Sequence, residues 1–315
     1  MPLLLFAALL ALHFAGWAQA LPRILLFTGT APGAYRHDSI PVAADTITAM
    51  GNGSLPLDAN VVDPSLLTSN SAARWETVHT EDKTLFEQSG WLNQFDLVAF
   101  VHTTDANPPE TGSVLTPAGA KNLCTYFSQG GGFVGIHSAS ASMYSYGCYG
   151  RVLGAYFDYH PEIQNFTISA VDSSHLSTSR LPKNLLLYEE LYHFRSDPRA
   201  LPSPAHVLVT NTSAVQDPGV NLRNFRLGGD GPAPHPLAWY REGNLLASVD
   251  GNTALAQTGS LADNLNSTTG FETFGKQPAA GRSWYSSMGH ANATWAIPAY
   301  RGHVLGGFAW VLQSR

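Results

Sequence analysis

Apolar runs alternate with amphipathic segments along the first half of the chain. Each run is bounded by glycine, proline or polar residues, as is typical of buried strands. Strands are predicted at residues 23–28, 75–80, 96–101 and 132–136. Helices are predicted between them at residues 40–50, 83–86 and 117–129. Strands that alternate with helices favour an α/β fold with a mainly parallel central sheet and right-handed crossovers.

The second half of the chain continues this sheet. Strands are predicted at residues 166–171, 206–210, 235–240 and 282–288, and a closing helix at residues 300–311. The first two of these strands are expected to form an antiparallel edge. Residues 211–234 and 251–277 lack periodicity, so we predict a long loop and a polar insertion there. The length of 315 residues, of which 44% are hydrophobic, favours one large domain over residues 21–315.

The strand at residues 132–136 ends at His137, which is the first candidate site residue. Ligands of open parallel sheets bind at the carboxyl ends of the strands, where the loops diverge. Residues 135–139 have the pattern of a nucleophile elbow, the turn that raises one side chain above the sheet. Because its apex is histidine and not serine or cysteine, the usual acyl-enzyme route is disfavoured. Ser138 lies one residue past the apex and is a weaker nucleophile candidate. Asp105 follows the strand at residues 96–101 and is expected on the same rim.

A compact run of titratable side chains lies at residues 185–194. It contains Glu189, Glu190, Tyr192 and His193, so two carboxylates stand close to a phenol and an imidazole. A partly desolvated carboxylate can have its pKa raised toward neutrality, which suits a general acid or base. The alternative is a surface strand or helix with ordinary charges.

The first twenty residues are apolar and end in Ala18-Gln19-Ala20, a small-x-small cleavage pattern. We predict a signal peptide over residues 1–20 and a secreted, extracellular protein; a retained anchor helix is the alternative. Five Asn-X-Ser/Thr sequons agree with a glycoprotein whose content of charged residues is only 13%. The sequon asparagines are Asn52, Asn165, Asn211, Asn266 and Asn292.

Cys124 and Cys148 are the two cysteines of the chain. In an oxidising compartment they could pair and tie the helix before the central strand to the loop after it. Two buried thiols are the alternative, whereas metal ligation by two isolated cysteines is disfavoured.

The charge of the chain bears on its partners. A net charge of −6 without a basic patch argues against a nucleic-acid partner. Beyond the signal peptide, no polybasic or amphipathic segment indicates membrane binding. Neither a nucleic acid nor a membrane surface is therefore expected as a partner.

Eight short motifs stand in order along the chain. They are Tyr35–Ile40, Gly131–Ala139, Leu153–Phe157, His160–Pro161, Glu189–Tyr192, His235–Trp239, Gly281–Arg282 and Gly289–His290. In their order and spacing they resemble the ThuA-like (trehalose-utilisation) family, whose fold is similar to that of class I glutamine amidotransferases. The resemblance spans residues 23–310 and implies a flavodoxin-like three-layer sandwich with a mainly parallel central sheet.

The resemblance also implies a pocket at the rim of this sheet, and it favours Glu190 over Glu189. The candidate catalytic residues are His137, Glu190, His160 and His290. The candidate substrate-binding residues are His37, Tyr192, Trp239 and Asp105. Imidazoles that converge on one carboxylate can move protons or bind a divalent metal. No local H-x-x-x-H signature supports the metal, so a metal cofactor stays open.

The family name points to disaccharide catabolism, in which a partner enzyme oxidises a glycoside to a keto-sugar that is then cleaved. We expect a secreted carbohydrate-active enzyme that cleaves or isomerises a sugar or keto-glycoside by acid–base chemistry of histidine and glutamate. Aromatic side chains near the motifs suit stacking on sugar rings, and suit a protein core equally well. The alternatives are a non-catalytic glycan-binding protein and a metal-assisted hydrolase.

Overall fold

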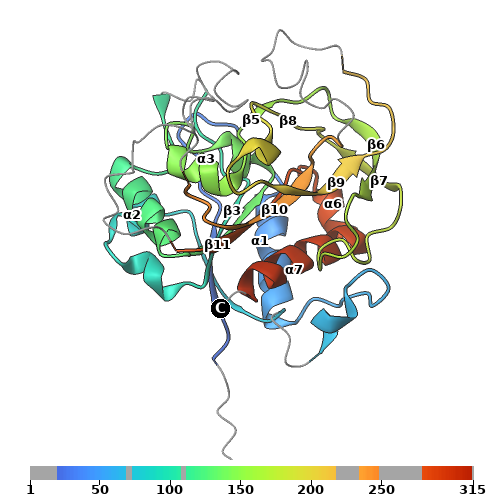
Figure 1. The fold of residues 1–315 in the computed structure, drawn as a ribbon, viewed down its shortest axis with the longest axis horizontal. Coiled ribbons are helices and arrows are strands. Elements are labelled where there is room, and N and C mark those ends of the chain that lie inside the picture. The colour runs from blue at the N-terminus through green and yellow to red at the C-terminus, as the bar shows by residue number, and fades with distance from the viewer. Residues whose placement is uncertain (1–19, 69–72, 108–110, 218–233, 248–278, 314–315) are drawn as a thin grey trace, which may run out of the picture.

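The computed structural model describes residues 20–68, 73–107, 111–217, 234–247 and 279–313. Strands and helices alternate through the first half of the chain, as the hydrophobic pattern predicts (Figure 1). The strands are β1 (Arg23–Phe27), β2 (Glu76–Thr80), β3 (Leu97–Val101), β4 (Gly132–Ile136), β5 (Phe157–Tyr159), β6 (Gln164–Ala170), β7 (Leu185–Glu189), β8 (His193–Phe194), β9 (His206–Asn211), β10 (Ala238–Gly243) and β11 (Gly281–Ser286). The α-helices are α1 (Ile40–Asn52), α2 (Pro117–Ser128), α3 (Gly147–Leu153), α6 (Asn292–Ala296) and α7 (Pro298–Leu312). The 3₁₀ helices are η1 (Pro64–Leu67), η2 (Lys83–Glu87), η3 (Trp91–Gln94), η5 (His137–Ala141) and η6 (Pro198–Ala200).

A nine-stranded sheet forms the centre of the fold, in the order β2-β1-β3-β4-β11-β10-β9-β6-β7. From β2 to β11 in this order the strands pair in parallel, which confirms the predicted parallel centre. Strands β10, β9, β6 and β7 pair antiparallel and form one edge of the sheet. The short strands β5 and β8 form a separate antiparallel pair. Because the parallel strands end at the same edge, the loops that follow them meet there.

Helices cover both faces of the sheet, so the predicted three-layer sandwich is confirmed (Figure 1). Alternate residues of β1 point to opposite faces. Leu25 and Phe27 belong to the core layer that contains residues of α2 and α3, whereas Ile24 and Leu26 belong to the layer of α1 and α7. All four side chains are fully buried. Burial on both faces explains why this strand is a continuous apolar run without polar alternation.

Two predicted elements, and the titratable run at residues 185–194, differ in detail in the structure. The run at residues 185–194 is divided into β7 and β8, because the pairing of β7 with β6 ends at Glu189. The strand expected at residues 235–240 begins at Ala238, and the ring of His235 contacts the Tyr192 carbonyl instead. The segment at residues 83–86 belongs to a 3₁₀ helix, η2, whose first turn is capped by the carboxylate of Asp82.

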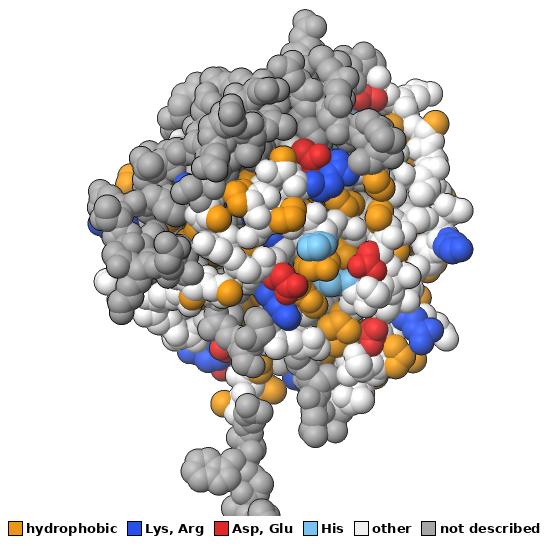
Figure 2. Space-filling model, in the orientation of Figure 1, with side chains coloured by type: hydrophobic (Ala, Val, Ile, Leu, Met, Phe, Trp, Pro, Cys, Tyr) orange, Lys and Arg blue, Asp and Glu red, His pale blue; other side chains and the backbone are white. Residues whose placement is uncertain are grey.

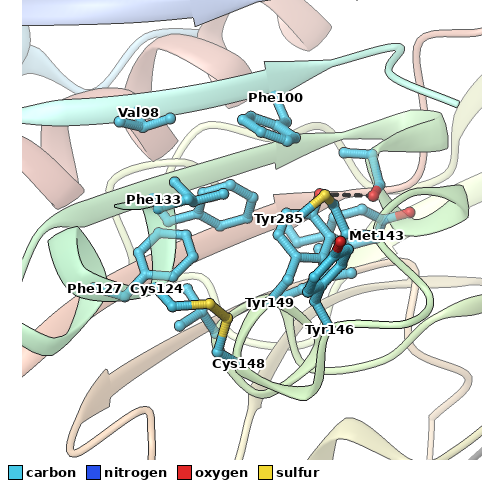
Figure 3. Close-up of a cluster of buried hydrophobic side chains, with 14 of the residues drawn as sticks. Val98, Phe100, Cys124, Phe127, Phe133, Met143, Tyr146, Cys148, Tyr149 and Tyr285 are labelled. Atoms are coloured by element: carbon cyan, nitrogen blue, oxygen red, sulfur yellow. Dashed lines mark hydrogen bonds between the residues drawn. A yellow bond between two sulfur atoms is a disulfide. The ribbon is translucent and has the colours of Figure 1, made fainter. Parts of the chain in front are cut away.

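Cys124 in α2 and Cys148 in α3 form a disulfide whose Cα atoms lie 5.9 Å apart. Both residues are fully buried, beside Phe127 and Tyr149 (Figure 3). Because Cys148 lies in a short helix and not in a loop, the bond joins two helices of the same layer. It therefore fastens the segment that follows His137 to helix α2.

The sequon asparagines that the structure describes differ in exposure. Asn52, Asn165 and Asn292 are exposed, whereas Asn211 is half-buried and its amide donates to the carbonyl of Ser213. Asn266 and residues 1–19 of the predicted signal peptide lie outside the described residues. Within the described part of the chain, no helix has both the length and the apolar character needed to cross a membrane.

Candidate functional site

Five loops bring four histidines and one glutamate together. His37 lies between β1 and α1, His102 follows β3, and His137 follows β4. Glu190 follows β7, and His290 lies between β11 and α6. These residues are far apart in the sequence, so the convergence depends on the order of the strands in the sheet.

His137 occupies the apex of the predicted elbow, between β4 and η5. Its φ angle of 53° lies in the left-handed region, which costs a non-glycine residue about 1–2 kcal/mol. Its Nδ1 lies 2.7 Å from the carbonyl oxygen of Ser287. Since a carbonyl oxygen can only accept, Nδ1 donates, and the Nε2 atom of the neutral ring presents a lone pair.

Four polar atoms surround the Nε2 atom of His137. They are the Nε2 of His37 at 3.1 Å, the hydroxyl of Tyr192 at 3.0 Å, the Nδ1 of His290 at 3.3 Å and the Oε2 of Glu190 at 3.4 Å. The structure therefore places four of the predicted site residues in direct contact with His137, which is itself fully buried.

Glu190 joins two of the histidines to each other. Its Oε2 atom lies 3.2 Å from the Nδ1 of His290, and its Oε1 atom lies 3.3 Å from the Nε2 of His160. Burial on its own raises the pKa of Glu190, but the surrounding histidines, His137, His290 and His160, outweigh it and lower the pKa below its usual range. The shift is thus opposite to the expected rise toward neutrality, because the surrounding imidazoles stabilise the charged form.

The histidines of this group differ in their protonation. Burial, followed by the nearby His137 and His290, lowers the pKa of His37 to about 2, so its ring is neutral at physiological pH. The hydrogen bond to Glu190 raises the pKa of His290. One ligand atom each from His37, His137, Glu190 and His290 lies within 4.8 Å of the others. Such a set can share protons or hold a metal ion.

His102 is not among the predicted site residues, yet it lies behind this group. Its ring centroid is 5.1 Å from that of His37 and 5.3 Å from that of His137. It is fully buried and, like His137, has a left-handed φ angle, here 54°. An imidazole directly after a buried strand is the same signal that identifies His137. This signal could have identified His102 from the sequence.

A cavity of about 550 Å³ opens beside the group, a size within the usual range of small-molecule sites. His37, His160, Glu190 and His290 are part of its lining. Its aromatic lining residues are Tyr35, Tyr144, Phe157 and Tyr192, and its charged ones include Asp105, Asp158 and Arg195. Figure 2 shows histidine side chains beside apolar ones near the middle of one face of the molecule.

Asp105 borders this cavity, but both of its carboxylate oxygens are engaged by the protein. Oδ1 accepts hydrogen bonds from the Ser113 hydroxyl at 3.0 Å and the Val114 amide at 2.9 Å. Oδ2 accepts from the Tyr144 amide at 3.2 Å. Asp105 therefore braces two segments of the cavity wall, and its oxygens are not directed at a ligand.

Trp239, which the sequence predicts to bind substrate, lies in the core and not in the lining of this cavity. Its side chain is fully buried, and its Nε1 atom donates to the Leu153 carbonyl oxygen at 2.8 Å. Its ring packs against Phe194 and Tyr285 in the core. The residue lies on β10, where alternate side chains point into the layer beneath the sheet, and it does not line the cavity.

Glu189 supports the site from behind. Its fully buried carboxylate accepts the amides of Gly289 and His290, each at 3.1 Å, and the Thr294 hydroxyl at the start of α6. A carboxylate at a helix N-terminus is favourable because it satisfies free amides there. The backbone that carries His290 is thereby fixed to the end of β7.

The chain matches the family model described as trehalose utilisation (ThuA) over residues 23–311. A solved ThuA-like protein from Bacteroides uniformis ATCC 8492 has a TM-score of 0.54 and 16% identity, and the match covers 95% of each chain. Another, from Parabacteroides merdae ATCC 43184, has a TM-score of 0.53 and 14% identity, and covers 94% of this chain and 91% of that one. No curated protein matches the chain. The solved structures show the fold alone, whereas the family model extends over nearly the whole sequence. The chain therefore belongs to the trehalose utilisation (ThuA) family.

Proposed function

We propose that this protein is an enzyme that acts on a sugar or keto-glycoside by acid–base chemistry. The observation that carries the proposal is the contact between His160 and Glu190, 3.3 Å long, in the wall of a ligand-sized cavity. The description of the family as trehalose utilisation supports a carbohydrate substrate. The aromatic lining of the cavity supports it as well, because flat apolar rings with polar tips stack well on sugars.

His160 is the group best placed to exchange a proton with a ligand. Its Nδ1 atom donates to the Pro161 carbonyl oxygen at 2.8 Å, so its Nε2 atom faces Glu190 Oε1. With Nδ1 donating, Nε2 of a neutral ring keeps the lone pair that can accept a proton from a substrate, and the carboxylate of Glu190 stabilises the imidazolium that forms. The side chain of His160 is 34% exposed and that of Glu190 is 10% exposed, so the imidazole has the better access to a substrate. Glu190 orients it.

Cleavage of a keto-glycoside requires the transfer of two protons. A base removes the acidified proton next to the ketone, the bond to the leaving oxygen breaks, and an acid protonates that oxygen. His160 can carry the first proton. Tyr192 and His290 also line the cavity, so their hydroxyl and imidazole groups can stabilise the negative charge that develops on the substrate oxygen.

Export is part of the same proposal. A signal peptide over residues 1–20 would deliver the chain to an oxidising compartment, where a disulfide between Cys124 and Cys148 persists. The exposed sequon asparagines Asn52, Asn165 and Asn292 are accessible to a glycan there.

Proton NMR of the mature protein with disaccharides and their keto derivatives tests the proposal. The wild type should remove the anomeric signal of at least one compound, and His160→Gln and His137→Ala should not. His206→Gln is the matched control, because His206 is an exposed histidine on β9. If every compound survives but several bind, the protein is a glycan-binding protein, and binding should then depend on Tyr144 and Phe157.

A further inference from the structure

We propose that His37, His137, His290 and Glu190 bind one divalent first-row transition-metal ion, for which Zn²⁺ is the best match. The site lies in the wall of the proposed active site, so its role in catalysis rests on the proposed function. The binding of the metal itself rests on the geometry and the protonation of these four side chains.

The spacing of the four ligand atoms matches a tetrahedral metal centre. Bonds of about 2.0–2.1 Å to zinc, arranged tetrahedrally, place neighbouring ligand atoms about 3.3 Å apart. His137 Nε2 lies 3.1 Å from His37 Nε2, 3.3 Å from His290 Nδ1 and 3.4 Å from Glu190 Oε2. The distance from His290 Nδ1 to Glu190 Oε2 is 3.2 Å. Four of the six separations between these ligand atoms thus match those that one zinc ion requires, and all six are within 4.8 Å.

The donor and acceptor character of these four atoms is also compatible with a metal ion. His137 Nε2 presents a lone pair, because Nδ1 of that ring donates to the Ser287 carbonyl. The Oε2 atom of an ionised glutamate is also an acceptor, and both atoms face the same point. In the metal-free protein, ring protons on His37 and His290 can donate to His137 Nε2 and Glu190 Oε2. Once those two protons are lost, all four atoms present lone pairs that one cation can accept together.

Neighbouring groups hold the ligands as they do in known metal sites. A histidine ligand normally donates its other ring nitrogen to a carbonyl or carboxylate, which fixes the tautomer. Ser287 supplies that carbonyl for His137. The Nδ1 atom of His37 lies 3.4 Å from the Ser138 hydroxyl. Glu189 holds the backbone of His290, and the second oxygen of Glu190 contacts His160.

The composition of the ligand set selects the class of metal. Three imidazoles suit zinc, iron, nickel or copper, whereas magnesium and calcium prefer sites made of oxygen ligands. His137 is fully buried, but His37, Glu190 and His290 border the cavity. A ligand in the cavity can therefore approach the metal from this side. With all four side chains bound, a substrate oxygen or a water on this side would be a fifth ligand, which the ion would polarise.

Metal content and a cobalt spectrum test the site without any assay of activity. The mature chain is prepared without a histidine tag, stripped with chelator, dialysed against Zn²⁺ or Co²⁺, and measured by mass spectrometry and visible absorption. The wild type should retain one equivalent of metal, and the Co²⁺ form should show intense tetrahedral bands. Glu190→Gln and His290→Asn should each weaken Zn²⁺ affinity at least 10-fold. His206→Gln, which changes an exposed histidine on β9 that is not a ligand, should retain one equivalent.

Two results would overturn the metal site. One is a wild-type chain that retains much less than one equivalent after dialysis. The other is an equal loss of metal in His206→Gln and Glu190→Gln, which indicates binding by exposed histidines. Circular dichroism of each variant shows whether it is folded, and the half-exposed His290 provides the mildest ligand change. If stripped protein binds no metal yet still converts a keto-glycoside, only the metal inference fails. If metal binds but no sugar is converted, only the proposed function fails.

Discussion

Glu189 and Glu190 are neighbours in the chain, yet their carboxylates act on the same histidine in two different ways. Glu189 accepts the backbone amide of His290 at 3.1 Å, and Glu190 Oε2 lies 3.2 Å from the Nδ1 atom of its ring. One carboxylate fixes where the backbone lies, and the other fixes how the ring is oriented. The two carboxylates at the end of β7 therefore hold both the backbone and the ring of His290.

Replacing Glu189 with glutamine should destabilise the protein and also disturb the site. The amide keeps the shape of the side chain but cannot accept at both oxygens, so an amide of the 289–291 turn loses its charged partner. We expect a loss of about 1–3 kcal/mol in the free energy of unfolding, together with weaker metal binding. Urea unfolding and zinc titration measure the two effects. Glu162→Gln, at an exposed position, should change neither the free energy of unfolding nor zinc binding. If Glu189→Gln and Glu162→Gln behave alike, the proposed role of Glu189 in holding the 289–291 turn is contradicted.

The central strands of the sheet could be predicted from the sequence, because they leave a local hydrophobic pattern. Strands β1, β3 and β4 are buried on both faces, so their apolar runs are visible without a structure. His137 could be placed for the same reason, since it directly follows such a run. The contacts of the site could not be predicted in this way, because His137 and His290 are separated by 153 positions. The division of labour between Glu189 and Glu190 depends on where β7 ends, which no local pattern marks.

Two differences between expectation and structure have the same physical origin. An aromatic side chain such as Trp239 suits a sugar site, but on β10 this side chain points into the core. The carboxylate of Glu190 is buried as expected, but histidines from other loops reverse the effect of burial on its pKa. In both cases tertiary contacts decide the outcome, and a single sequence does not show them.

The contrast between Trp239 and Tyr192 can be tested with a matched pair of variants. Trp239→Phe removes core volume and the hydrogen bond to Leu153, so unfolding should become easier by about 1–3 kcal/mol. Its effect on KM for a converted sugar should be small. Tyr192→Phe removes the hydroxyl 3.0 Å from His137 and should lower kcat about 10-fold or more, with little loss of stability. If Trp239→Phe instead raised KM without loss of stability, a substrate-binding role of Trp239 would be supported.

Removing the disulfide should weaken the fold without altering the chemistry. The bond between Cys124 and Cys148 closes a loop with a sequence separation of 24. A closed loop of this length stabilises a protein by about 3 kcal/mol through the unfolded chain. The variant Cys124→Ser with Cys148→Ser should lose that amount in urea unfolding. Reductant should destabilise the wild type and leave the variant unchanged. If reductant does not shift the urea-unfolding transition of the wild type, the expected contribution of the disulfide to stability is contradicted.

Acid should destabilise the fold through buried neutral histidines, of which His303 is the clearest. Burial lowers the pKa of His303 to about 4, against about 6.5 in an unfolded chain. Between these values the unfolded state binds the proton and the native state does not, so stability is lost as the pH falls through the window from about 6.5 to about 4. The loss is on the order of 3 kcal/mol for this residue.

His303→Gln should reduce this sensitivity to acid. Glutamine cannot be protonated in this range and can keep a contact with the Ser177 carbonyl. Urea unfolding at about pH 7.5 and about pH 4.5 should show a smaller difference for this variant than for the wild type. The exposed His206 provides the control variant, His206→Gln, which should behave as the wild type does. An undiminished difference in His303→Gln would assign the acid sensitivity to other groups.

Small-molecule rescue distinguishes a proton carrier at His160 from a structural residue. His160→Ala should lower kcat about 10²- to 10⁴-fold, the range that a positioned acid or base contributes. The side chain of His160 is 34% exposed, so its removal leaves a space beside Glu190 that is open to solvent. Imidazole added to the solution can enter this space. Turnover should then rise with imidazole concentration and saturate, whereas imidazole should not revive Glu190→Gln. A merely structural His160 would give an alanine variant with altered stability and KM, and no response to imidazole.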